Sequence, residues 1–233
     1  GHRSVSSKCG SADLLKAVGV NIEIPQKSVL DCLDKIGIAF FFAPKFQQSW
    51  QSSQGPRMEI GARTIFNILG PLTNPARIKR QLIGVYDTSL MITLAKVMKE
   101  LGAKQVMIVH GEDGLDEISI TGKSRIVELI NGEIYDYTIA PENFQLLSAP
   151  LSSIQSGSCL DNIKILKSIL KGKKSPAMDV AILNAAAAIK VSGRVNSLNE
   201  GIEFARESIL SGKAKEKLDK LIDLTNDTKK QIH

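Results

Sequence analysis

Four carboxylates lie within six residues in the stretch His110-Gly-Glu-Asp-Gly-Leu-Asp-Glu-Ile-Ser119. They are Glu112, Asp113, Asp116 and Glu117. Carboxylates this close repel each other unless a cation lies between them. Hard oxygen ligands suit Mg²⁺, which commonly bridges one or two carboxylates to the phosphate groups of a substrate. The stretch therefore predicts a magnesium site, with a solvated acidic turn as the alternative.

The apolar run Val106–Val109 directly precedes the acidic stretch and predicts a buried strand. A second strand is expected at Leu82–Tyr86, and an apolar stripe from Leu90 to Leu101 predicts a helix between them that Gly102 ends. Strand, helix and strand over about thirty residues form a βαβ unit with parallel strands. Functional groups commonly follow the carboxyl ends of such strands, which is where the acidic stretch is expected.

Residues 1–13, GHRSVSSKCGSAD, form a loop of small residues before a short helix expected at Leu14–Val18. Ser11 or Asp13 is a candidate cap for that helix. Free N–H groups at a helix N-terminus bind anions well, so the loop is a candidate anion site; an ordinary capped loop is the alternative.

The rest of the chain predicts an α/β fold with a mostly parallel central sheet flanked by helices and a helical C-terminal half. Asn131-Gly132 predicts a hairpin turn, and Leu183-Asn-Ala-Ala-Ala-Ala-Ile189 predicts a closely packed helix. Residues 1–233 are expected to form a single domain. The other expected helices are 28–36, 60–69, 160–170, 179–191, 198–210 and 214–224, and the other expected strands are 38–42, 117–120, 124–130 and 133–139.

The composition is that of an ordinary globular protein, with 43% hydrophobic and 23% charged residues. The net charge of +6 fits anionic substrates, but the basic residues are not interleaved with aromatic ones, which argues against specific nucleic-acid recognition. Cys9, Cys32 and Cys159 are far apart in sequence and are expected to be reduced thiols. With no membrane-length apolar run and no secretory signal, a cytoplasmic protein is expected.

Several stretches together resemble the anthranilate phosphoribosyltransferase family, from the first residues to about Ala214. The block ending in Leu-Gly-Pro-Leu-Thr-Asn-Pro75 and the Asp-Gly-Leu-Asp-Glu117 turn are specific in combination. The resembling stretches are 3–13, 42–46, 60–75, 109–119 and 183–188.

The resemblance implies the large α/β domain of an enzyme of the nucleoside phosphorylase and phosphoribosyltransferase type, usually a homodimer. The family transfers phosphoribose from phosphoribosyl pyrophosphate (PRPP) to the amine of anthranilate in tryptophan biosynthesis, releases pyrophosphate and uses Mg²⁺. Its partners are therefore expected to be small-molecule substrates and a second copy of the chain, with neither a membrane nor a nucleic acid among them.

The resemblance also implies roles for particular residues. Asp116 and Glu117 match the family's metal-binding pair, and Arg57 matches an arginine that contacts the anthranilate carboxylate. A planar, permanently charged guanidinium suits that partner. His2 is a candidate contact to anthranilate. The PRPP site is expected to be lined by Arg3, Ser4, Val5, Ser6, Ser7 and Ser11. The sequence singles out no general base.

The chain departs from the family pattern in three ways. The family has a helical domain before the loop of residues 1–13, which we call the Ser/Gly loop. That domain carries the motifs Gly-Thr-Gly-Gly-Asp, Asn-x-Ser-Thr and Lys-His, and none of these motifs occurs in the 233 residues. His2 stands where the family usually has asparagine, and Gln47 stands where it has a histidine near anthranilate. We therefore expect the 233 residues to fold but to be poorly active and prone to self-association.

Two other functions remain open at this point. A pyrimidine nucleoside phosphorylase shares the scaffold, but it needs neither the acidic pair nor Arg57. A non-catalytic relative that binds nucleic acid through a basic surface fits the positive charge, but such a protein has no reason to keep the metal and acceptor residues.

Overall fold

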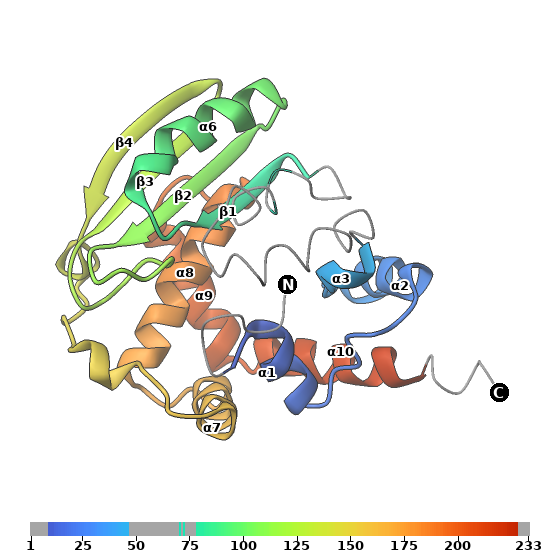
Figure 1. Cartoon of the computed structure of the whole chain (residues 1–233). Coiled ribbons are helices and arrows are strands. Elements are labelled where there is room, and N and C mark those ends of the chain that lie inside the picture. The colour runs from blue at the N-terminus through green and yellow to red at the C-terminus, as the bar shows by residue number, and fades with distance from the viewer. Residues whose placement is uncertain (1–8, 47–69, 71, 73–77, 228–233) are drawn as a thin grey trace, which may run out of the picture. The chain divides into compact units, whose positions relative to one another are not determined.

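The computed structural model describes residues 9–46, 70, 72 and 78–227 (Figure 1). These residues fall into two compact units, which are described one at a time. The first unit holds 9–46, 156–172 and 209–227, and the second holds 70, 72, 78–155 and 173–208. The expectation of a single domain over residues 1–233 stays a prediction.

The second unit is built on a four-stranded sheet in the order β1-β2-β3-β4. The parallel pair β1–β2 is joined through α6, as the βαβ prediction requires. The elements of this unit are β1 (Arg80–Gly84), the 3₁₀ helix η2 (Thr88–Leu90), α6 (Met91–Glu100), β2 (Gln105–Gly111), β3 (Ser124–Ile130), β4 (Glu133–Ile139), the 3₁₀ helices η3 (Pro141–Phe144) and η4 (Leu151–Ser153), α8 (Pro176–Ser192) and most of α9 (Leu198–Leu210).

The α/β class is confirmed, but the prediction of a mostly parallel sheet is wrong for the part of the chain that the structure describes. Both β2–β3 and β3–β4 are antiparallel pairs. The connection 112–123 folds back as a turn instead of forming the crossover helix that a parallel neighbour needs. Asn131 and Gly132 have φ angles of 54° and 83°, which suits the predicted tight hairpin between β3 and β4.

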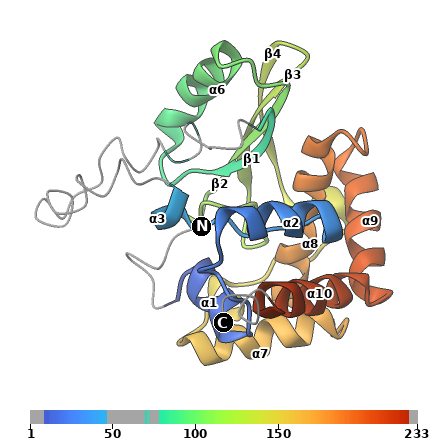
Figure 2. The ribbon, with the colours of Figure 1, turned by 90° about the vertical axis from the view of Figure 1, so that its right-hand side faces the viewer.

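Helices cover both faces of the sheet, with α6 packed on one face and α8 on the other (Figure 2). Val106 and Ile108 of β2 and Leu94 and Met98 of α6 belong to one buried cluster. Met107 and Val109 point to the opposite face because side chains alternate along a strand. Their exposed fractions are all 3% or less, so β2 is apolar on both sides.

Helices α8 and α9 meet closely at Gly201. A Cβ atom at this position would lie 2.7 Å from the carbonyl oxygen of Ala186 and 3.0 Å from its Cα atom. Main-chain atoms of a buried helix have little room to move aside. A glycine in the middle of a helix is therefore explained here by the approach of a neighbouring backbone.

We expect Gly201→Val to lower the free energy of unfolding by about 3 kcal/mol, the upper end for overpacking a core. Urea unfolding followed by circular dichroism measures the change. Asn199→Val is the matched control, because Asn199 lies on the same helix but is exposed, and its effect should stay within about 0.5 kcal/mol. Equal losses in the two variants would mean that valine harms the helix itself, not the packing.

A polar network crosses the face of the sheet that α8 covers, and each strand contributes one member. Arg80 donates to the side chain of Gln105 at 2.6 Å and to the carbonyl of Val191 at 2.9 Å, near the end of α8. Lys190 of α8 bonds both carboxylate oxygens of Glu128 at 2.6 Å, and the Tyr137 hydroxyl donates to the same carboxylate at 2.9 Å. The network fixes the end of α8 against all four strands.

The network makes stability depend on pH at the alkaline end. Burial, the charge of Glu128 and the hydrogen bond to Glu128 raise the pKa of Tyr137 well above its ordinary value. The folded state thus holds this proton more tightly than the unfolded state, whose tyrosine titrates near pH 10. The resulting stability is present below about pH 10 and is lost as the pH rises further. Chemical denaturation from pH 8.5 to 11.5 should show this loss, and Tyr137→Phe should reduce it; an unchanged slope in the variant would contradict the assignment.

The first unit is helical within the described residues. Its helices are α1 (Ser11–Ala17), α2 (Gln26–Ile36), α3 (Ala43–Phe46), α7 (Cys159–Leu170) and α10 (Lys213–Asp227). α2 packs on α10 and α1 packs on α7. Val20, Cys32 and Leu221 belong to the buried cluster of this unit. None of the helices in the described part of the chain is both long and apolar enough to cross a membrane.

Two predicted strands are wrong. Residues 38–42 form neither a helix nor a strand, and they lead into α3. Residues 117–120 are not a strand either, and the main-chain N–H groups of Ile118 and Ser119 bond to side chains instead of to a neighbouring strand. The predicted helix at 60–69 lies outside the described residues.

Candidate functional site

The acidic stretch folds into a tight turn directly after β2. The Gly111 N–H donates to the Leu115 carbonyl at 2.8 Å, and the Gly114 N–H donates to the Gly111 carbonyl at 2.9 Å. Gly114 has a φ of 87°, a conformation that residues with a side chain rarely adopt. Gly114 thus allows the tight reversal at the carboxyl end of β2, which is where the sequence placed the acidic stretch.

Asp113 lies inside this turn and holds it together. Its carboxylate accepts hydrogen bonds from the Ser119 hydroxyl at 2.5 Å, the Thr121 hydroxyl at 2.7 Å and the Leu115 N–H at 3.1 Å. Burial raises the pKa of Asp113, but these hydrogen bonds outweigh burial and hold the pKa below its ordinary value. Asp113 is therefore a structural carboxylate whose oxygens are already bonded, a role that the sequence left open.

The segment Asp116–Ile118 is held from two other elements. A Cβ atom at Gly84 of β1 would overlap the carbonyl oxygen of Asp116, so the two main chains approach as closely as a glycine permits. From α8, Asn184 bonds both main-chain groups of Ile118. Asp116, which is one of these fixed points, and Glu117, which lies between the two, are the predicted metal pair.

The side chains of Asp116 and Glu117 both reach solvent. Although Glu117 as a residue is exposed, protein atoms remove much of the hydration of its carboxylate. Desolvation is the largest cause that raises the pKa of Glu117, followed by the negative charges of Asp116 and Asp113. Negative charge is thus concentrated at an accessible edge, as the sequence predicted.

The donor set suits a hard cation that keeps several water ligands. Among the described residues, no three side chains of the histidine, cysteine, aspartate or glutamate types come together as a metal centre. A cation held here would rest on the two carboxylates, with water and a substrate completing its shell. Mg²⁺ is commonly bound in this way, so Asp116 and Glu117 fit it.

The Ser/Gly loop is described only from Cys9 onward. Ser11 is the exposed first residue of α1, and the Gly10 N–H before it donates to the Asp13 carboxylate at 3.0 Å. The Gly10 N–H is therefore bonded within the chain. Seven predicted site residues lie outside the described residues: His2, Arg3, Ser4, Val5, Ser6, Ser7 and Arg57.

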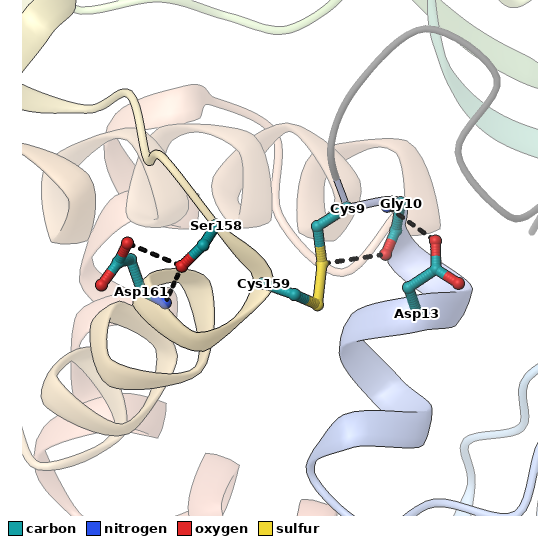
Figure 3. The surroundings of a disulfide bond; sticks show 6 residues. All are labelled: Cys9, Gly10, Asp13, Ser158, Cys159 and Asp161. Carbon is teal, nitrogen blue, oxygen red and sulfur yellow. Dashed lines mark hydrogen bonds between the residues drawn. A yellow bond between two sulfur atoms is a disulfide. The ribbon is translucent and has the colours of Figure 1, made fainter.

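Cys9 is joined to Cys159, the first residue of α7, by a disulfide bond (Figure 3). The two Cα atoms are 5.1 Å apart although 150 positions separate the residues in sequence. Cys32 is free and buried. The prediction of three reduced thiols is thus wrong for two of them, because distance along the chain was taken for distance in space.

Two residues that hold the segment Asp116–Ile118 from other elements were not recognised in the sequence. Gly84 looks like an ordinary strand residue, and no local pattern marks it. Asn184 carries a detectable signal, because it is the one polar residue among the six of Leu183–Ala188, where the other five are apolar. A polar side chain on a buried helix needs a partner, and the sequence does not say which.

Comparisons with known proteins cover almost the whole chain. Residues 1–215 match the family described as "Glycosyl transferase family, a/b domain". The chain is 48% identical over 226 residues to the anthranilate phosphoribosyltransferase of Petrotoga mobilis and 45% identical to that of Acetivibrio thermocellus. These alignments cover 97% of this chain and 66% of each relative, so the chain spans about two thirds of the length of the curated relatives it matches.

Solved structures agree with the sequence relatives. Anthranilate phosphoribosyltransferase from Thermus thermophilus superposes with a TM-score of 0.89 at 37% identity, over 97% of this chain and 67% of that one. The Saccharomyces cerevisiae enzyme in complex with PRPP and Mg gives 0.88 at 29% identity, over 97% and 64%. The chain therefore belongs to the glycosyl transferase family with this a/b domain, and it is similar to the anthranilate phosphoribosyltransferases over nearly all of its length.

Proposed function

We propose that this protein transfers phosphoribose from PRPP to the amine of anthranilate and releases pyrophosphate, with Mg²⁺ held at Asp116 and Glu117. The observation that carries the proposal is the solvent-facing carboxylate pair, fixed from β1 and α8 just past the end of β2. The similarity to anthranilate phosphoribosyltransferases supports it, as does the yeast relative in complex with PRPP and Mg.

The proposed reaction does not depend on a strong general base. The uncharged aromatic amine of anthranilate attacks the ribose carbon as pyrophosphate departs. Positioning of the substrates and stabilisation of the developing charge therefore provide most of the rate enhancement. Mg²⁺ bound at the turn would neutralise negative charge on the leaving pyrophosphate. The Ser/Gly loop would bind phosphate groups, and Arg57 would orient the anthranilate carboxylate. Pairing with a second copy of the chain also stays a prediction.

The test is an assay for phosphoribosyl anthranilate in the presence and absence of Mg²⁺. It is run on the complete gene product and on residues 1–233, because the alignments leave about one third of each relative unmatched. We expect magnesium-dependent turnover by the complete product and little from residues 1–233. No product from either, together with no binding of PRPP in calorimetry, would refute the proposed function.

A further inference from the structure

We propose that Asn184 is a positioning residue for the metal-binding pair: its side-chain amide fixes the main chain of Ile118 and thereby aims Asp116 and Glu117. This inference rests on the proposed function, because it concerns the same metal site. Asn184 lies on α8, 66 positions from Ile118 in sequence, and both residues belong to the same compact unit.

The side-chain amide of Asn184 has three main-chain partners. Its Oδ1 atom accepts from the Ile118 N–H at 3.0 Å, while its Nδ2 atom donates to the Ile118 carbonyl at 2.8 Å and to the Val180 carbonyl at 3.0 Å. The partners fix its orientation, since a flipped amide would place its acceptor against two carbonyl oxygens. Asn184 thus supplies to the main chain of Ile118 the hydrogen bonds that a neighbouring strand would supply in a sheet.

The position of Ile118 makes these bonds important for its neighbours. Ile118 is 1% exposed and immediately follows Glu117, so its main-chain groups have little access to water. Without the amide, a buried donor and a buried acceptor would lose their partners, and the chain would shift to satisfy them. Any such shift moves Asp116 and Glu117. Partners behind metal ligands commonly change metal affinity by about 10–100-fold when they are removed.

The test measures Mn²⁺ in place of Mg²⁺, by electron paramagnetic resonance of the free ion, with PRPP present, on the complete gene product. Asn184→Ala suits the surrounding alanine-rich helix and should weaken Mn²⁺ binding about 10-fold. Asn184→Asp is the second variant, of nearly the same size. The added negative charge of Asn184→Asp would by itself strengthen Mn²⁺ binding. Weaker Mn²⁺ binding in this variant would therefore show that the position of the carboxylate pair, and not the local charge, determines the affinity.

Ser175→Ala is the matched control. The Ser175 side chain caps the same helix by accepting from the Met178 N–H at 3.2 Å, and none of the described hydrogen bonds joins it to the turn. Its loss should cost about 1 kcal/mol of stability and leave Mn²⁺ affinity unchanged. Metal affinity that falls as much in Ser175→Ala as in Asn184→Ala would reduce Asn184 to a general support of α8 and overturn the inference.

The remaining outcomes separate this inference from the proposed function. If the unmodified protein binds no Mn²⁺ with PRPP present, the proposed metal site fails and the inference fails with it. If the unmodified protein binds Mn²⁺, Asp116→Asn abolishes that binding and both Asn184 variants bind normally, the proposed function stands and the inference alone is overturned.

Discussion

Replacing Lys190 by methionine is expected to lower the free energy of unfolding by about 3–5 kcal/mol, a large share of the stability of a typical domain. The Glu128 side chain is only 5% exposed, and Lys190 bonds both of its oxygens. Methionine fills a similar volume but leaves a buried carboxylate whose remaining partner, among the described hydrogen bonds, is the Tyr137 hydroxyl. A buried charge without its counter-charge is one of the most costly defects that a single substitution creates.

A second substitution tests whether the charge or the packing is responsible. Adding Glu128→Met to Lys190→Met removes the orphaned carboxylate, and we expect most of the lost stability to return. Tyr137 is partly exposed as a residue, so we expect its hydroxyl to bond water once the carboxylate is gone. Denaturant unfolding is measured for the unmodified protein, for Lys190→Met, for Glu128→Met and for the double variant. These four proteins form a double-mutant cycle, which isolates the interaction energy of the pair.

An exposed pair provides the control. Lys215 and Asp219 are four residues apart on α10, and both side chains are more than half exposed. Lys215→Met should change the free energy of unfolding by no more than about 0.5 kcal/mol. If Lys190→Met is equally mild, Glu128 either takes up a proton or finds another partner in the folded state. In that case the pair does not hold α8 to the sheet.

Local patterns were sufficient for much of this fold. The apolar run of β2, the glycine after α6 and the Asn131-Gly132 turn each act over a few residues, and the structure confirms the elements they predict. The acidic stretch was recognised for the same reason, because its four carboxylates lie close together in sequence. The choice of Asp116 and Glu117 as the metal pair came from the family resemblance and stays a prediction. Features that depend on partners far along the chain were not found, and Asn184 with Ile118, Lys190 with Glu128 and Cys9 with Cys159 are the examples.

The wrong prediction of a strand at 117–120 has a physical cause. Apolar residues such as Ile118 and Ile120 are buried, as their type suggests, with exposed fractions of 1% and 0%. Burial alone does not make a strand, since a strand also needs a neighbouring backbone for its hydrogen bonds. At the turn, the side chains of Asn184 and Ser124 supply those bonds, and no pattern within 117–120 reveals them.

The crowding of negative charge at the proposed metal pair predicts a loss of activity without a loss of stability when one carboxylate is removed. Glu117→Gln should lower kcat/KM for phosphoribosyl transfer by about 10²–10³, because a group that stabilises charge in the transition state is lost. It should not lower the melting temperature, since it removes a carboxylate whose pKa is raised by desolvation and by its negative neighbours. Residues that serve function at the expense of stability show this signature.

Neighbouring carboxylates of the same turn supply the comparison. Asp113→Asn should reduce both activity and stability, because the bonds to Ser119, Thr121 and Leu115 hold the turn. Glu112→Gln should change neither, since the Glu112 side chain is exposed and only its main-chain N–H bonds Lys123 among the described hydrogen bonds. Steady-state kinetics and thermal unfolding of the three variants distinguish the roles. If Glu112→Gln impaired turnover as much as Glu117→Gln, activity would depend on the total negative charge of the turn, and the assignment of the metal to Asp116 and Glu117 would be lost.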